Sequence, residues 1–383
     1  MATAIGELQG SAGTLEQPSL PKLHPFTKMS RDTSNRSPWN SPFSWGIVLP
    51  SGRRQESIEG VLIGCAVGES LARFQSLVQR EGLRVDAIES SLGTLRPAHR
   101  TDGLIITIQS LLLSQAVPEL FRKRLANRLA WYQRSLWFSF PSGFRLGLGR
   151  RNRALRAYAG NDPLIRAVAL SVLMQGHHEG VLRWIQKSTS ITHQDKWIAH
   201  ACYLLAAAVQ CAQFHRTQHA IPTSQLLSDL KQACPSPEIT DRIEVLEQGF
   251  ERGESTRTIS QLLGYTEGWL DNLVDNALLG IYTYVRHSES FSAGVEDLLS
   301  IPGELHGVLA IYGSLSAIHL GIKGIPKPLR TQLSLYPYSA AWVQQYVDRC
   351  LDWPHGTEDI QRTRSLPSHP VGQILRNLSR ASR

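Results

Sequence analysis

Apolar residues recur every three to four positions between residues 57 and 351, and polar residues fill the positions between them. This period is typical of amphipathic α-helices, whereas the strict alternation of half-buried strands is scarce. The pattern predicts an all-α fold with a single compact helical domain. We expect helices over residues 57–73, 103–115, 118–135, 162–174, 178–187, 194–214, 223–233, 236–252, 256–263, 267–286, 291–299, 307–321 and 338–351. The sequence shows no self-similarity at a period of about 34 or 40 residues, which argues against a solenoid.

Two of these expected helices carry small residues at every fourth position. The first stripe consists of Gly60, Gly64 and Gly68, and the second of Gly313, Ala317 and Gly321. Each glycine inside a helix costs about 1 kcal/mol relative to alanine, so such stripes indicate close approach of a neighbouring backbone. The two stripes can pack against each other or flank a common helix. The alternative is that each merely fits a crowded core.

The two ends of the chain differ from this helical body. Residues 1–45 are rich in Ser and Pro without sustained periodicity, and they predict a disordered leader. Residues 46–353 form the expected helical domain. Residues 354–383 contain five arginines and one short apolar trio, and they predict a loose basic tail.

Charge, cysteine content and apolar stretches indicate which partners and which cellular compartment to expect. The 383 residues carry 40 Lys and Arg against 32 Asp and Glu, and a net charge of +8 permits an anionic partner without requiring one. The five cysteines are scattered and include no CxxC pair, so we expect free thiols in a reducing compartment and a cytoplasmic location. The least polar stretches, residues 104–118, 198–214 and 308–322, are interrupted by polar residues and shorter than a membrane span. We therefore expect no membrane partner.

Motifs that carry chemistry are few. The sequence contains no phosphate-binding loop, HExxH, GxSxG or EF-hand loop. Thr101 and Asp102 open an expected helix, where such residues usually cap free N–H groups. The same pair can also bind a hard divalent ion. Glu304 and His306 alternate along a loop and can face one point, where a carboxylate and an imidazole would suit a transition metal.

A basic run offers a different kind of site. Five arginines lie between residues 145 and 156, and Arg122, Lys123 and Arg124 precede them. With neighbouring aromatic residues, this run could meet phosphates and stack on bases. Aromatic residues at helical spacing are more often core residues, so we do not expect nucleic acid to be the partner.

Five segments, in order, resemble one protein family. They are GVLIGCAVGESLA, HRTDGLIITIQSLLLS, AGNDPLIRAVALSVLMQG, ITHQDKWIAHACYLLAAAV and PGELHGVLAIYGSLSAIHLGIKGIP. Together they resemble the ADP-ribosylglycohydrolases over about residues 57–330. The resemblance implies a compact all-helical fold, in agreement with the periodicity. It also implies a site in which two Mg²⁺ ions orient the ribose of ADP-ribose and help to cleave an N- or O-glycosidic bond.

The resemblance places the metal ligands on two motifs, which this chain only partly matches. Thr101 and Asp102 match the family's TDD triplet, but Gly103 stands where the second Asp belongs. In the late DTDT turn, Glu304 replaces one Asp and His306 replaces the other. Mg²⁺ requires near-octahedral oxygen coordination, so these exchanges predict the loss of the paired-metal site.

Other positions of the family pattern concern catalysis and substrate. Glu69 replaces an Asp of the first motif and is our candidate catalytic residue. Gly160, Asn161 and Arg166 keep their places in the motif implied to bind substrate.

We therefore expect a non-catalytic member of the family that binds an ADP-ribose-like ligand or a protein partner, such as an ADP-ribosylated protein. The alternative is an active hydrolase with a rearranged site. That enzyme would use Mg²⁺ or another divalent ion, with one metal on Asp102, Glu304 and His306.

Overall fold

The computed structural model describes residues 49–81, 94–114, 117–135, 162–174, 178–193, 195–216, 221–265, 272–303, 305–335, 338 and 340–353. The expected leader and tail lie outside these residues. The α-helices are α1 (Ser51–Leu71), α2 (Gln75–Glu81), α4 (His99–Leu112), α5 (Pro118–Ser135), α7 (Asp162–Leu173), α8 (His178–Thr192), α9 (Lys196–Phe214), α10 (Thr223–Ala233), α11 (Pro237–Arg252), α12 (Thr256–Leu262), α13 (Leu273–Arg286), α14 (Phe291–Leu299), α15 (His306–Leu320), α16 (Lys327–Gln332) and α17 (Ala340–Leu351). Two 3₁₀ turns, Ala72–Phe74 and Ile322–Gly324, follow α1 and α15.

The predicted all-α fold is confirmed. Within the described residues there is no strand, and an isolated bridge joins Leu95 to Leu333. Helices α5, α10 and α14 begin and end where the periodicity predicts. The short helices α2 and α16 were not expected, because the few apolar residues of QSLVQRE and KPLRTQ do not recur at a helical spacing.

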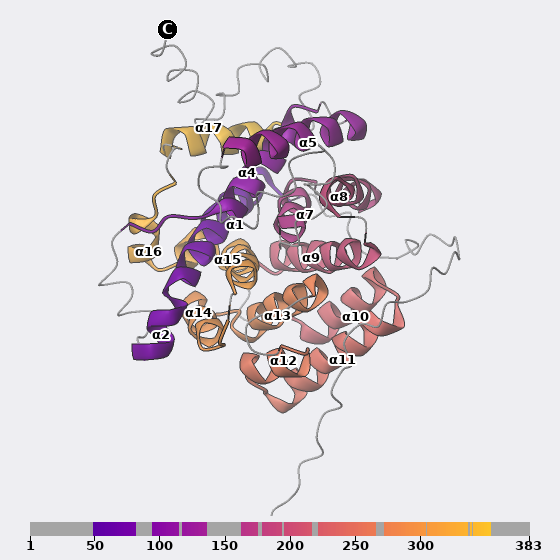
Figure 1. The fold of residues 1–383 in the computed structure, drawn as a ribbon, viewed down its shortest axis with the longest axis vertical. Helices are drawn as coiled ribbons and strands as arrows, with labels where there is room; N and C mark the ends of the chain where they lie inside the picture. The colour runs from indigo at the N-terminus through magenta and orange to yellow at the C-terminus, as the bar shows by residue number, and fades with distance from the viewer. Residues whose placement is uncertain are drawn as a thin grey trace, which may run out of the picture.

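Helix α1 runs through the centre of the molecule and packs along α15 (Figure 1). The two backbones touch at each small residue of the α1 stripe. A Cβ atom on Gly60 would lie 2.6 Å from the carbonyl oxygen of Ala317, and one on Gly64 would lie 2.1 Å from that of Gly313. One on Gly68 would lie 2.1 Å from that of Leu309. Since the α15 partners descend in number as the α1 residues ascend, the helices are antiparallel.

Direct packing of the two stripes is thus confirmed for most of their members. Gly321 is different. It follows the last residue of α15 and has a φ of 75°, in the left-handed region that favours glycine at helix ends. This glycine ends the helix and does not belong to the α1–α15 interface.

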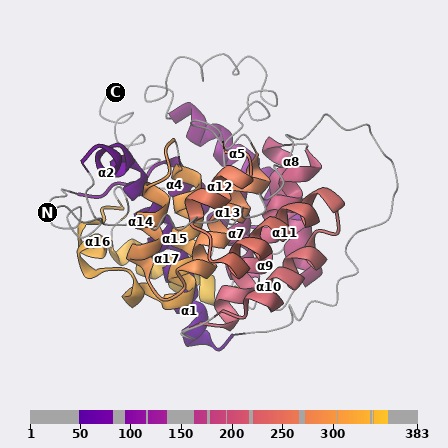
Figure 2. The same cartoon turned by 90° about the horizontal axis from the view of Figure 1, so that it is seen from below.

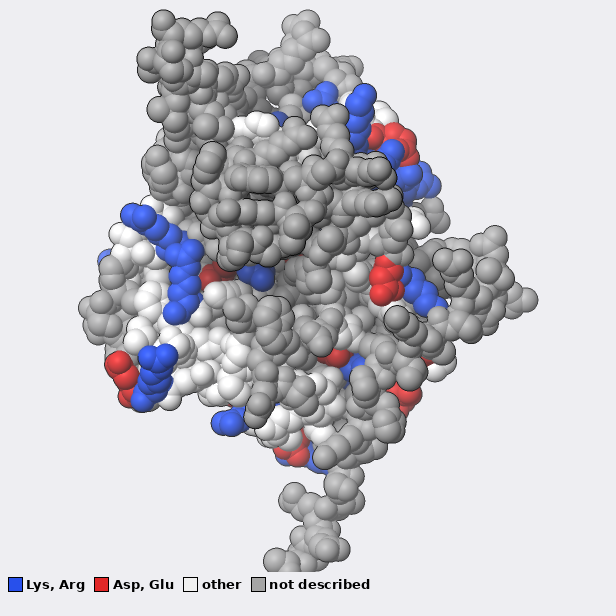
Figure 3. All heavy atoms as spheres, viewed as in Figure 1, with Lys and Arg blue, Asp and Glu red and all other residues white. Residues whose placement is uncertain are grey.

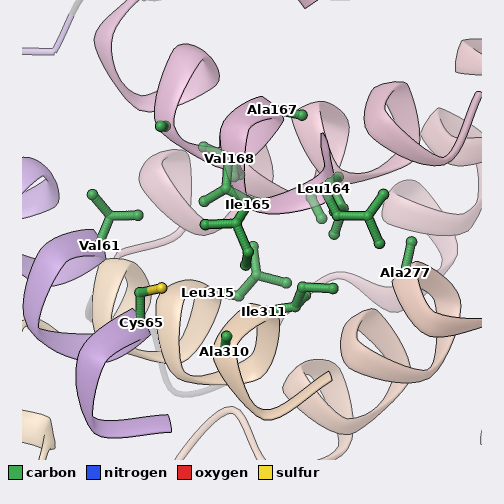
Figure 4. Close-up of a cluster of buried hydrophobic side chains, with 14 of the residues drawn as sticks. Val61, Cys65, Leu164, Ile165, Ala167, Val168, Ala277, Ala310, Ile311 and Leu315 are labelled. Atoms are coloured by element: carbon green, nitrogen blue, oxygen red, sulfur yellow. The ribbon is translucent and has the colours of Figure 1, made fainter. Parts of the chain in front are cut away.

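The core surrounds this interface (Figure 4). Val61 and Cys65 of α1 lie beside Ile311 and Leu315 of α15, and α7 and α13 complete the cluster. Helices α10, α11 and α12 lie at one end of the molecule, and α4, α5 and α17 lie at the other (Figure 1). The view from below shows the helices packed side by side around α15 (Figure 2).

Burial accounts for the most apolar helices. The α1–α2 segment Ser51–Glu81 and helix α9 are long and apolar enough, by length and composition alone, to cross a membrane. In each, 67% of the most apolar window is buried inside the fold. Both segments therefore serve as core helices here.

Arg54, near the start of α1, fixes the ends of two other helices. Its guanidinium donates to the carbonyl oxygens of Leu351 and Cys350 in α17, at 3.2 Å each, and of Leu173 in α7, at 3.3 Å. A cation suits these carbonyl ends because helix C-termini carry partial negative charge. The contact also shows that α7 ends near the start of α1.

Candidate functional site

Three helices begin where α1 ends. The first residue of α15, His306, lies one turn before Leu309, which touches Gly68. The start of α4 is bonded to Glu69, and the starts of α4 and α7 are linked by His99 and Asp162, whose nearest side-chain N and O atoms are 3.6 Å apart. The fold thus places Thr101, His306 and Asp162, which follows Gly160 and Asn161 in the chain, in helices that begin beside one end of α1.

Glu69 is buried and caps the start of α4. Its Oε2 accepts from the backbone N–H groups of Ala98 and Thr101, and its Oε1 accepts from that of Arg100, at 3.0 Å each. The Thr101 hydroxyl also donates to Oε2, at 2.9 Å, and the Arg100 guanidinium lies 3.6 Å from Oε1. A carboxylate at this position satisfies N–H groups that lack helical partners and complements the positive helix end. Its assignment as a catalytic residue stays a prediction.

This arrangement corrects our expectation for the helix start. Helix α4 begins at His99, and its N-cap residue Ala98 provides no side-chain cap, so neither Thr101 nor Asp102 caps the helix. The cap comes instead from Glu69 in another helix. Because that residue lies about 30 positions earlier, the local sequence around Thr101 could not reveal it.

Asp102 is half-buried and accepts hydrogen bonds from two tyrosines. The hydroxyl of Tyr132, on α5, donates to its Oδ2, and that of Tyr338, two residues before α17, also bonds its carboxylate. Burial raises the pKa of Asp102 to about 6, and the tyrosine hydrogen bonds oppose that rise. Its charge raises the pKa of Tyr132 and Tyr338 further above the level set by their burial.

Gly103 follows Asp102 on α4 and is buried. A Cβ atom placed there would meet no atom within 4 Å outside its own helix among the residues that the structure describes. The described part of the chain therefore leaves room for a methyl group at this position.

The late motif is partly described. His306 is half-buried, and its neighbours Leu305 and Gly307 are buried. Glu304 lies outside the described residues. Among the residues that the structure does describe, no group of three or more His, Cys, Asp or Glu side chains is placed to hold a metal ion.

The expected substrate residues fall into two groups. Gly160 and Asn161 lie outside the described residues. Arg166 is fully buried on α7, and its guanidinium donates to the Ser188 hydroxyl at 3.0 Å and to the Thr192 hydroxyl at 2.6 Å, both on α8. These bonds fasten α7 to α8.

Comparison with known proteins identifies the family. The model of the ADP-ribosylglycohydrolase family matches residues 50–359. The chain belongs to the ADP-ribosylglycohydrolase family. It is also similar in fold to a solved structure described as an ADP-ribosylglycohydrolase-related protein complex, with 21% identity and a TM-score of 0.51. The similarity covers 78% of this chain and 97% of that one. A comparison with curated protein sequences finds no match.

Thr101 of the early motif and His306 of the late motif both belong to helices that begin beside the end of α1. Their shared role as metal ligands stays a prediction. Sequence reasoning missed Tyr132 and Tyr338, the partners of Asp102. Neither lies in a family motif that we recognised, and no local pattern links them to Asp102. Only the packing of α5 and α17 on α4 places their hydroxyls at the carboxylate.

The described basic residues do not form one continuous patch on the face shown in Figure 3, where Lys and Arg lie in separate groups. On α5, the exposed Glu119 pairs with Arg122 at 3.1 Å and also with Lys187 of α8. The run between residues 145 and 156 lies outside the described residues, so nucleic-acid binding there stays a hypothesis.

Proposed function

We propose that this chain is an ADP-ribosylglycohydrolase family member that binds an ADP-ribose-like ligand without cleaving it. The observation that carries the proposal is at the start of α4. There the carboxylates of Glu69 and Asp102 accept from protein donors, and Gly103 offers no side chain.

The donor set does not fit two Mg²⁺ ions. Mg²⁺ favours hard oxygen ligands, and three Asp positions of the two family motifs are changed in this chain, to Gly103, Glu304 and His306. The Thr101 hydroxyl donates to Glu69, and Asp102 shares its carboxylate with two tyrosines. Gly103 supplies no ligand atom, and His306 offers nitrogen where the family has carboxylate oxygen. We therefore derive no hydrolytic step through a metal.

Ligand binding rests on what the chain retains. The starts of α4, α7 and α15 gather at one end of α1, and helix N-termini carry partial positive charge. Glu69 caps α4 and Asp162 lies in the first turn of α7, which leaves the start of α15, whose first turn contains no acidic residue, to favour an anionic group. The family acts on ADP-ribosylated substrates, and the pyrophosphate of ADP-ribose is such a group.

The test combines turnover and binding on the full chain. We expect no release of ADP-ribose from ADP-ribosylated arginine or serine peptides in the presence of Mg²⁺. We also expect ADP-ribose to raise the thermal unfolding midpoint equally with Mg²⁺ and with a chelator. Adenosine, which lacks the pyrophosphate, is the matched control ligand and should produce a smaller rise.

Two results would refute the proposal. Robust release of ADP-ribose would show an active hydrolase, and its loss in a His306→Ala variant would support the alternative of a rearranged single-metal site. Absence of any midpoint change with ADP-ribose would remove the ligand-binding role.

A further inference from the structure

Asp102 connects α4 to the next helix, α5, and to the segment before α17, which is far along the chain. It lies in the first turn of α4, Tyr132 comes from α5, and Tyr338 comes from the segment before α17. We call these three residues the Asp102 cluster. Both tyrosine side chains are more than nine-tenths buried, so their hydroxyl groups need an acceptor within the protein. The Asp102 carboxylate is that acceptor for both.

Aromatic contacts extend the cluster along α17. The Trp342 ring packs against Tyr338, with ring centroids 4.4 Å apart, and stacks on Tyr346, with centroids 4.8 Å apart. Tyr346 in turn donates to the backbone carbonyl of Ile105 on α4, at 2.8 Å. The row of three rings thus begins and ends with a hydrogen bond to α4.

We propose that Asp102 is a positioning residue that holds α5 and α17 on the start of α4 through its two tyrosine partners. It occupies a position that carries a metal ligand in the family pattern. Partial burial of a carboxylate removes part of its hydration, and this loss must be compensated. A cation would compensate it by its charge, and two hydroxyl donors compensate it here by hydrogen bonds. The inference rests on the proposed loss of the paired-metal site and names what the retained aspartate does instead.

Double-mutant cycles on the full chain test this role. Asp102→Asn, Tyr132→Phe and Tyr338→Phe should each lower the thermal unfolding midpoint by about 2–4 °C. Either tyrosine variant combined with Asp102→Asn should lower it by less than the sum of the single effects, because the amide keeps one acceptor oxygen without the charge and both changes therefore act on the same hydrogen bond. Tyr346→Phe is the matched control. The Tyr346 hydroxyl donates to the backbone carbonyl of Ile105 on α4 and not to Asp102. Its effect on the midpoint should therefore add to that of Asp102→Asn.

Hydrogen exchange gives a readout that a general loss of stability would not reproduce. In Tyr338→Phe, amides of α17 should exchange faster while those of α9 keep their protection, because α9 packs mainly on α7, α13 and α10. The tyrosine variants delete a single oxygen each, so they keep the test available even where Asp102→Asn fails to fold.

Three outcomes would overturn the inference: additive cycles, unchanged exchange in α17, or a midpoint raised by Mg²⁺ in the wild type and not in Asp102→Asn. The last would make Asp102 a cation ligand. These failures differ from failure of the proposed function, which turnover of ADP-ribosylated peptides would reveal whether or not the cycles are additive.

Discussion

The α1–α15 interface and the start of α4 meet at the same end of α1, but they are built in opposite ways. The interface depends on missing side chains, since Gly60, Gly64 and Gly68 let two backbones touch. The start of α4 depends on polar side chains that reach it from other helices, with Glu69 and Tyr132 among them. Close backbone contact thus stabilises one region, and hydrogen bonds from side chains of other helices stabilise the other.

The largest expected loss of stability comes from a substitution that disrupts the α1–α15 interface. In Gly64→Ala, the new Cβ would lie 2.1 Å from a backbone carbonyl oxygen, and no flexible side chain can move aside. We expect the free energy of unfolding to fall by at least about 3 kcal/mol in urea titrations. Gly52→Ala in the same helix is the control, because its Cβ meets nothing within 4 Å and should cost nothing. Equal stability of the two variants would contradict the close packing.

The next largest loss of stability comes from a substitution that removes the Glu69 cap of α4. Glu69→Ala leaves three backbone N–H groups and the Thr101 hydroxyl without their acceptor, so the free energy of unfolding should fall by about 3 kcal/mol. Glu69→Gln keeps one acceptor oxygen and should lose less. Glu59→Ala, on the same helix, removes a bond from Gln55 within one turn and should lose below about 0.5 kcal/mol. Denaturant unfolding followed by circular dichroism measures all three.

The polar cluster of Asp297, His287 and Thr256 lies outside both regions and predicts how stability depends on pH. Burial would raise the pKa of Asp297, but hydrogen bonds from His287, at 2.9 Å, and Thr256, at 2.5 Å, outweigh it and hold the pKa below its usual value. A carboxyl group with a lowered pKa contributes stability above its unfolded pKa of about 3.9 and loses it as the pH falls through the folded value. His287→Ala should therefore cost about 1 kcal/mol at neutral pH and start acid unfolding at a higher pH.

The exposed Glu289 supplies the control for that experiment. Glu289→Ala should leave the acid unfolding curve in place. Identical curves for His287→Ala and the wild type would contradict the role of His287.

The smallest effect concerns Gly103, which stands where the family's TDD triplet has its second Asp. Gly103→Ala adds a methyl group that meets no atom of the described residues within 4 Å outside its helix, and alanine favours helix more than glycine does. We expect the free energy of unfolding to rise by about 0.5–1 kcal/mol. Destabilisation would mean that the start of α4 is as crowded as the α1–α15 interface.

The features that depend on a local repeat of residues could be predicted from the sequence. Most helices and the contact between the two small-residue stripes were predicted, because apolar and small residues repeat along a single helix. The family motifs also indicated that Thr101 and His306 belong to neighbouring regions. The hydrogen bonds at these positions could not be predicted, since the cap Glu69 and the partner Tyr338 reach α4 from helices elsewhere in the chain.

The central claim is that protein donors at the start of α4 have replaced paired Mg²⁺. Calorimetric titration of the full chain with Mg²⁺ tests it most directly, with Asp102→Asn titrated in parallel. The account predicts no stoichiometric binding to either protein. Binding of one or two Mg²⁺ ions per chain that disappears in Asp102→Asn would contradict it.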